Sequence, residues 1–231
     1  YKNPPQSQWS SLTQRPTQSF AEIEETVKSI FKEIQTKGDT AVAKYTSLFD
    51  GIKLENFLVT ENEIKEAEKQ VSTEIKDAIA LAKSNIYKFH SAQKTSKIEV
   101  ETTKGVVCWQ EKRPIQKVGL YIPSGTAPLF STVLMLAIPA QIAGCEEIIL
   151  CSPPDKNGEI NPAILYAANL CGVTKIYKVG GIQAIAALTF GTETIPKVYK
   201  IFGPGNQFVT VAKQVATQFG TAIDMTAGPS E

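Results

Sequence analysis

Residues 118–135 read VGLYIPSGTAPLFSTVLM, and this stretch begins the pattern that decides the fold. The apolar run at 118–122 predicts a buried strand, and the segment at 128–143 predicts a helix that Gly144 ends. The same alternation then repeats along the chain. Further strands are predicted at 147–151, 175–179, 198–202 and 222–225, and helices at 161–170, 182–190 and 207–219. Short apolar strands separated by helices predict an α/β fold, a Rossmann-like parallel sheet with helices on both faces.

The chain before this pattern is predicted to be mostly helical. Ser19 is a candidate N-cap for a first helix that Gly38 ends, and a second short helix spans 39–49. Two more helices are predicted, one over 61–70 after a Thr60/Glu63 capping box and one from Ser72 to about residue 94. Residues 98–110 alternate around a Lys104-Gly105 turn, which predicts a β-hairpin.

Composition places the 231-residue chain among ordinary globular proteins, with 42% apolar residues and a net charge of +1. This balance gives no reason to expect a nucleic acid or a membrane as partner. No signal peptide is recognisable at the start of the sequence. The four cysteines form no CxxC motif, so we expect a reduced, cytoplasmic protein rather than a disulfide framework. His90 is the single histidine, which excludes a zinc or acid/base site built from several imidazoles within these residues.

The loops after the predicted strands are the candidate functional region, because ligands bind at the carboxyl ends of parallel strands. These loops are rich in glycine and proline and carry Tyr121, Gln183 and Asn206. Each of the three has an ordinary structural role open to it: a ring covering the sheet end, a solvated first helical turn, and an N-cap. Each could equally contact a bound ligand. The G-x-G-x-x-G nucleotide motif is absent, although Gly203-Pro-Gly keeps its first two glycines.

A cysteine nucleophile is the main chemical alternative from the residues themselves. Cys151 ends a predicted strand at the functional edge, whereas Cys145 and Cys171 fall at turns on the opposite edge. Cys108 lies in the hairpin with no histidine nearby in sequence to activate it. His90 falls near the end of a helix, where a structural role is the simpler interpretation.

Five motifs together resemble one enzyme family, histidinol dehydrogenase. They are GLYIP at 119–123, APLFSTVLM at 127–135, GGIQAIAAL at 180–188, FGPGN at 202–206 and DMTAGPSE at 224–231. The resemblance extends from about Arg15 to Glu231. Two positions depart from the family pattern: Ser124 stands where a second glycine is usual, and Thr226 where proline is usual.

The resemblance implies oxidation of L-histidinol to L-histidine through L-histidinal, with NAD⁺ as oxidant and one zinc per site. It implies that Tyr121, Gln183 and Asn206 contact NAD and that Ser230 contacts substrate. The family's zinc ligands and catalytic Glu-His pair follow Gly-Pro-Ser-Glu, so this chain is expected to contain no catalytic or metal-ligating residue of that set. By itself it should be inactive, and the full-length enzyme is expected to be a homodimer.

The resemblance also implies an aldehyde-dehydrogenase-like domain architecture. Residues 1–117 are then expected to be a helical lobe plus hairpin, part of an interrupted first domain. Residues 118–229 would be the Rossmann-like domain, and 230–231 the start of a remainder not contained here. Two other functions stay open: a cysteine-dependent aldehyde dehydrogenase or acyl-phosphate reductase, and a non-catalytic nucleotide-binding module.

Overall fold

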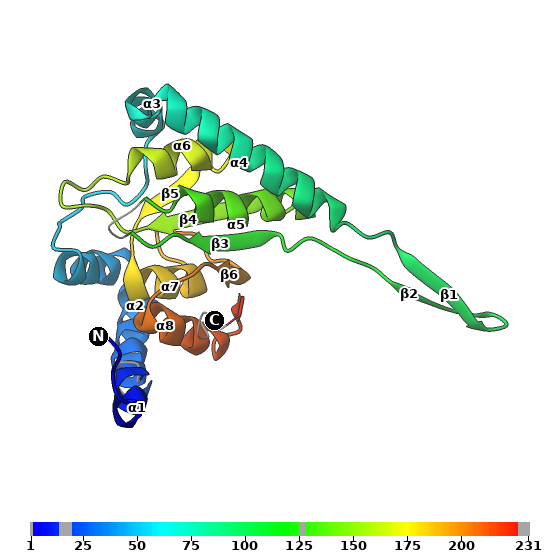
Figure 1. Cartoon of the computed structure of the whole chain (residues 1–231), viewed down its shortest axis with the longest axis horizontal. Helices are drawn as coiled ribbons and strands as arrows, with labels where there is room; N and C mark the ends of the chain where they lie inside the picture. The colour runs from blue at the N-terminus through cyan, green and yellow to red at the C-terminus, as the bar shows by residue number, and fades with distance from the viewer. Residues whose placement is uncertain (1, 14–19, 125–127, 226–231) are drawn as a thin grey trace.

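Five parallel strands form the central sheet, in the order β5-β4-β3-β6-β7, in a computed structural model that describes residues 2–13, 20–124 and 128–225 (Figure 1). The strands are β3 (Lys117–Tyr121), β4 (Glu147–Ser152), β5 (Lys175–Lys178), β6 (Lys200–Phe202) and β7 (Ala222–Ile223). All four neighbouring pairs are parallel. The predicted α/β class and Rossmann-like sheet are therefore confirmed, and the strands differ from the predicted ranges only at their ends.

Four helices connect these strands and cover both faces of the sheet (Figure 1). Gly144 ends the first of them in the left-handed conformation, and Asn161 caps the second through its side chain, with Pro162 in the first turn. Each helix begins or ends within two residues of its predicted range. Their bounds are α5 (Phe130–Ala143), α6 (Pro162–Leu170), α7 (Gly181–Phe190) and α8 (Gln207–Thr217).

The helices that precede the sheet pack on both of its helical layers. The long helix α2 (Phe20–Phe49) packs against α7 and α8, while α3 (Glu61–Gln70) packs against α6 and α4 (Thr73–Ala92) against α5. Two short elements, η1 (Gln6–Gln8) and α1 (Trp9–Thr13), begin the described chain. The division between residues 1–117 and 118–229 stays a prediction, and the observed packing couples the earlier helices closely to the sheet.

The break predicted at Gly38 lies inside α2, where this residue has a φ of +51° and a non-helical ψ. The Glu193 carboxylate, from the loop after α7, accepts a hydrogen bond of 2.7 Å from the Asp39 backbone N–H. This contact holds the pKa of Glu193 below its usual range. A side chain distant in sequence thus caps the second half of the helix. Ser19, the predicted cap of the first half, lies outside the described residues.

Sequence signals place the next two helices correctly. Thr60 and Glu63 form the complete capping box of α3, and Ser72 caps α4 by accepting a hydrogen bond from the Ile75 N–H. Just before α3, residues 57–59 pair with the outer edge of β5. The Val59 N–H donates to the Ile176 carbonyl at 2.9 Å, and the Lys178 N–H donates to the Phe57 carbonyl at 2.8 Å. This edge of the sheet is therefore covered.

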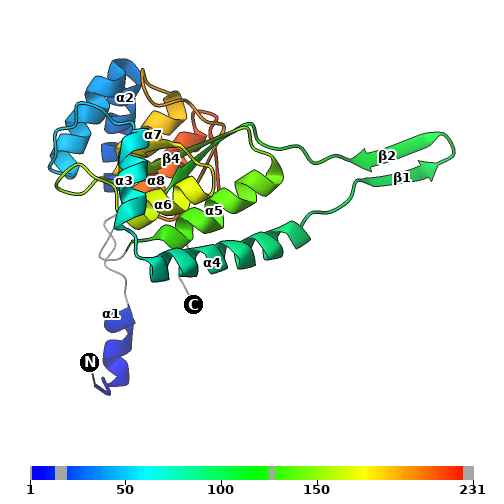
Figure 2. The same ribbon diagram turned by 90° about the horizontal axis from the view of Figure 1, so that it is seen from above.

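The predicted hairpin is present as β1 (Ile98–Thr103) and β2 (Val106–Gln110), antiparallel and turning at Gly105 with a φ of +84°. Every residue of both strands is exposed, and the hairpin projects away from the sheet and its helices (Figure 2). Elsewhere, buried side chains form two clusters, one on each face of the sheet. Within the described residues, no helix combines the length and apolar character needed to cross a membrane.

Candidate functional site

A cavity of about 640 Å³ opens at the carboxyl edge of the sheet. It lies where the chain leaves β3 and β6, two neighbouring strands whose following helices cover opposite faces of the sheet. Such a switch point is where open parallel sheets bind ligands. The cavity is lined by Thr26, Phe49, Asp50, Tyr121, Pro123, Ser124, Leu129, Pro153, Gly181, Ile182, Gln183, Pro204, Gly205, Asn206 and Phe208.

Two backbone segments meet tightly beside this cavity. Gly203 follows β6 with a φ of +140°, and a Cβ atom there would lie 2.1 Å from the Tyr121 carbonyl oxygen. Glycine is thus required both by the backbone conformation and by the space available. A Cβ on Gly205 would lie 2.4 Å from a Val209 methyl group, so this glycine lets the loop pack on the first turn of α8. The paired glycines serve close packing between elements.

Lys213 and Asp224 hold the loop after β6 in place through contacts with Gly203. The buried Lys213 ammonium donates to the Gly203 carbonyl at 2.8 Å and forms an ion pair with Asp224. The other Asp224 oxygen accepts a hydrogen bond of 2.8 Å from the Gly203 N–H. Both backbone groups of one glycine are therefore satisfied by a charged pair, which fixes the loop that borders the cavity.

Tyr121 ends β3 and is buried in the cavity wall. Its hydroxyl oxygen accepts a hydrogen bond of 3.1 Å from the Gly181 N–H at the start of α7. Burial raises the pKa of Tyr121 to about 12, so the phenol stays protonated in the physiological range. The side chain therefore joins the ends of β3 and α7 and leaves its own O–H available as a donor.

Gln183 lies in the first turn of α7 and is completely buried. Its Nε2 donates to Oδ2 of Asp50 at 3.1 Å, whereas its Oε1 has no hydrogen-bond partner among the described residues. Asp50 directly follows α2, and burial raises its pKa to about 6. The pair thus brings a carboxyl group that is hard to ionise against an amide with an unused acceptor.

Asn206 immediately precedes α8 and caps it. Its Oδ1 accepts a hydrogen bond of 3.1 Å from the Val209 N–H. The cap uses the oxygen of the carboxamide, and the side chain also lines the cavity. The two interpretations that the sequence leaves open for this residue are therefore compatible.

The structure brings the three predicted contact residues, Tyr121, Gln183 and Asn206, to one cavity. Ser124 is exposed at its rim. Ser230, the predicted substrate contact, and Thr226 lie outside the described residues. Sequence reasoning missed Asp50, because it follows a helix of the first half of the chain and belongs to no motif. Its only local signal is a carboxylate beside Phe49 at a helix end, which is common in helices.

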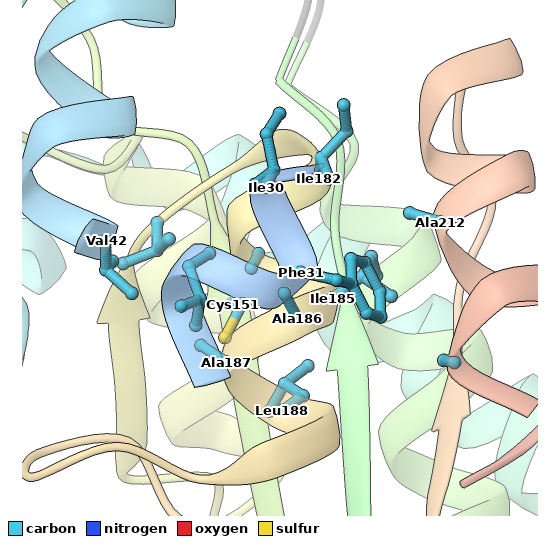
Figure 3. Close-up of a cluster of buried hydrophobic side chains, with 14 of the residues drawn as sticks. Ile30, Phe31, Val42, Cys151, Ile182, Ile185, Ala186, Ala187, Leu188 and Ala212 are labelled. Carbon is cyan, nitrogen blue, oxygen red and sulfur yellow. The ribbon is translucent and has the colours of Figure 1, made fainter. Parts of the chain in front are cut away.

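The cysteine alternative finds no support in the geometry. Cys151 is the residue that would have to act as a nucleophile, but it is fully buried in the cluster between the sheet and helices α2 and α7 (Figure 3). This burial raises the pKa of its thiol strongly, which disfavours the reactive thiolate. Cys108 is exposed on the hairpin, and the pKa values of Cys145 and Cys171 are raised by burial.

The described residues contain no group of three or more His, Cys, Asp or Glu side chains that could hold a metal ion. His90 lies in the last turn of α4, away from the cavity, with its Nδ1 2.7 Å from the Gln93 Oε1. Its surroundings are those of a surface histidine at a helix end, as the structural interpretation predicts.

Comparison with known proteins gives one consistent result. The family model described as histidinol dehydrogenase matches residues 13–231. A histidinol dehydrogenase of Bacteroides fragilis (strain ATCC 25285) is 58% identical over 230 residues, which cover 100% of this chain and 54% of that protein. One of Escherichia coli O6:H1 is 54% identical over 223 residues, covering 95% and 50%. The chain thus spans about half the length of these curated relatives.

A solved structure agrees with this result. The crystal structure of histidinol dehydrogenase from Elizabethkingia anophelis superposes with a TM-score of 0.90 at 58% sequence identity. The match covers 99% of this chain and 53% of the other. From the family model, the identities and the shared fold, we conclude that this chain belongs to the histidinol dehydrogenase family.

Proposed function

We propose that the cavity binds NAD⁺ and that the chain supplies the cofactor-binding part of an enzyme that oxidises L-histidinol to L-histidine through L-histidinal. The observation that carries this proposal is the meeting of Tyr121, Gln183 and Asn206 around one cavity at the switch point of the sheet. These residues come from the end of β3, the first turn of α7 and the N-cap of α8, and they are spread over more than eighty positions. The oxidoreductase class follows from the family, and the cofactor and substrate are part of the proposal.

The residues around the cavity fit a dinucleotide. Phe49, Tyr121 and Phe208 offer aromatic surface, Gln183 offers a buried acceptor without a partner among the described residues, and α8 begins at Gln207, directly after the lining residues Gly205 and Asn206. Helix N-termini favour phosphate groups, and aromatic surface favours flat rings. NAD⁺, when bound, supplies the acceptor for the hydride that leaves the alcohol carbon. The chain's own residues bind and orient it.

Zinc belongs to the proposal only for the whole enzyme. A catalytic zinc takes three protein ligands, and the described residues bring no such set together. We therefore assign no ligand and derive no step through the metal. The homodimer and the role of Ser230 stay predictions of the family resemblance, and the cytoplasmic location stays a prediction from the pattern of cysteines.

Calorimetric titration of the chain with NAD⁺ tests the binding proposal. Gln183→Ala should weaken binding about tenfold, the effect of one lost hydrogen bond to a buried group. Asn206→Ala should weaken it too, whereas Asn161→Ala, which removes the equivalent cap of α6 away from the cavity, should not. Failure of the unaltered chain to bind NAD⁺ at millimolar concentration would contradict the proposal.

Activity is tested by fusing this chain to the segment that follows the matched region in the Bacteroides fragilis relative. We expect the fusion to reduce NAD⁺ with L-histidinol and the chain alone to be inactive. If the chain alone reduced NAD⁺ with L-histidinol, the assignment of the catalytic groups to later residues would be wrong. A non-catalytic nucleotide-binding module would bind NAD⁺ equally well, but its fusion would stay inactive.

A further inference from the structure

The Gln183 carboxamide is buried in the cavity wall with only one of its two ends satisfied. Nε2 donates to Asp50 Oδ2 at 3.1 Å, and Oε1 has no partner among the described residues. A buried acceptor left unpaired costs roughly 1–3 kcal/mol, so native proteins keep few of them without a reason. Because Gln183 lines the cavity, a bound ligand is the natural source of the missing donor.

The space around Oε1 is kept open by a glycine. A Cβ atom on Gly181 would lie 3.0 Å from Oε1, closer than carbon and oxygen normally approach, and Gly181 has a φ of +56° that other residues rarely adopt. The Gly181 N–H is already used by the Tyr121 hydroxyl. It is therefore not available to Oε1. The described residues therefore leave this acceptor without a donor.

Asp50 decides which end of the carboxamide is left free. An ionised carboxylate only accepts hydrogen bonds, so it binds the NH₂ end of Gln183 and turns the oxygen away from itself. Without Asp50, the amide could rotate by half a turn and present a donor instead of an acceptor. The carboxylate, which directly follows α2 and belongs to none of the five motifs, thus sets whether Gln183 presents a donor or an acceptor.

The lining also restricts what can donate to Oε1. Among the described residues that line it there is no lysine or arginine, and Asp50 is the one carboxyl group. A phosphate next to Asp50 would meet an acid and no cation, which is unfavourable. The donor should therefore be an uncharged hydroxyl or amino group of the ligand, such as those on the sugars and the purine of a dinucleotide.

We propose that Asp50 is a positioning residue for the cofactor. It fixes the Gln183 carboxamide so that Oε1 accepts a hydrogen bond from a hydroxyl or amino group of the dinucleotide, away from its phosphates. This inference rests on the proposed binding of NAD⁺ in the cavity and adds the residue that orients the contact. Asp50 acts through Gln183 and takes no part in the reaction itself.

A double-mutant cycle measured by calorimetric titration with NAD⁺ tests the proposal. Asp50→Ala should weaken binding about tenfold. Asp50→Asn should stay within about threefold of the unaltered chain, because the new amide oxygen accepts from Nε2 in the same place. Asp50→Ala combined with Gln183→Ala should bind no more weakly than Gln183→Ala alone, since Asp50 acts only through Gln183. Asp77→Ala removes an exposed carboxylate of α4 and should change nothing.

Each outcome of these titrations supports or overturns the positioning role of Asp50. Asp50→Ala binding NAD⁺ like the unaltered chain, additive effects in the double variant, or Asp50→Asn as weak as Asp50→Ala would each overturn the positioning role. If the unaltered chain binds no NAD⁺, the proposed function fails first. If Asp50→Ala does not fold, as judged by its thermal transition, a loss greater than tenfold in the near-isosteric Asp50→Asn overturns the proposal. Titrations with ADP-ribose and with nicotinamide mononucleotide show which half of the dinucleotide carries the donor.

Discussion

Asp224 and Asp50 are two carboxylates near one cavity, and they differ in their hydrogen-bond and ion-pair partners. Asp224 accepts from the Gly203 N–H and is paired with the buried ammonium of Lys213, so a full positive charge faces it. Asp50 is half-buried and accepts one hydrogen bond, from the neutral carboxamide of Gln183. Burial is the main cause of its raised pKa, and no cation among the described residues offsets this effect.

The difference separates a carboxylate that holds the fold together from one that serves the proposed binding site. A partly buried carboxylate with a cation and a backbone donor holds the elements around it in place, here the loop after β6. A half-buried carboxylate with one neutral donor destabilises the empty protein slightly, and such groups gather at functional sites. We therefore expect changes at Asp224 to act on folding and changes at Asp50 to act mainly on binding.

Lys213→Met gives the largest expected effect. It leaves the partly buried Asp224 without its cation and removes the donor to the Gly203 carbonyl, so we expect a loss of about 3 kcal/mol in the free energy of unfolding. Urea denaturation followed by circular dichroism measures it. A loss below 1 kcal/mol would mean that the pair does not lock the loop and that the contrast with Asp50 is overstated.

Asp50→Asn should raise the free energy of unfolding, whereas Lys213→Met lowers it, and the increase should depend on pH. The folded pKa of about 6 exceeds the ordinary aspartate value of about 3.9, so the folded state holds the proton more tightly. The stability that this proton provides is complete below pH 4 and is lost as the pH rises to 6. Above pH 6 we expect Asp50→Asn to be more stable than the unaltered chain by about 1 kcal/mol, after allowing for partial exposure of the carboxyl group.

Thermal unfolding at pH 4 and at pH 7.5 checks this expectation. The two proteins should have the same Tm at pH 4 and differ at pH 7.5. Asp77→Asn, on the exposed face of α4, controls for the loss of one negative charge and should not change with pH in this way. Equal Tm values for Asp50→Asn and the unaltered chain at pH 7.5 would show that ionisation of Asp50 does not lower the stability of the folded chain.

Asn206→Ala tests whether a residue that lines the cavity affects both stability and NAD⁺ affinity. It removes the cap of α8, for which we expect a loss of about 1 kcal/mol in stability. Asn161→Ala removes a cap of the same kind from α6 and should cost a similar amount. The two variants should therefore unfold alike and differ in NAD⁺ affinity. If their affinities were equal, Asn206 would be a cap only.

Glu147→Gln should have the smallest effect. Glu147 forms surface ion pairs with Lys117 at 2.9 Å and with Lys175 at 2.9 Å, and these contacts lower its pKa. Exposed ion pairs contribute little to stability because water screens them. We expect a change in Tm smaller than that of Asn206→Ala. A larger change would show that charge pairs outside the cavity edge also hold the sheet.

The sheet, its helices and the hairpin were predictable because their signals are local. Apolar runs, Gly144 as a helix stop, and the Thr60/Glu63 box each act within a few residues, and the structure has each of them. The strand ends were less accurate, as with β6, which spans only Lys200–Phe202 of the predicted 198–202. Strand ends depend on neighbouring strands, which are distant in sequence.

The site was predictable in part. Tyr121, Gln183 and Asn206 follow strands or begin helices, so the parallel topology alone brings them to one edge. Asp50 was not predictable, because its contact with Gln183 joins residues 133 positions apart through the packing of α2 on α7. No periodicity or motif in the sequence predicts such a contact.

The sequence by itself determined the α/β class, the five strands, the hairpin and the edge of the sheet at which Tyr121, Gln183 and Asn206 meet, because each follows from local patterns and chain connectivity. Only the tertiary structure decided that Cys151 is fully buried, that Glu193 caps the second half of α2, and that Asp50 accepts a hydrogen bond from Gln183. The physical reason is common to all three. Burial and hydrogen bonding depend on which surfaces pack together, and that is set by the whole fold rather than by neighbours in sequence.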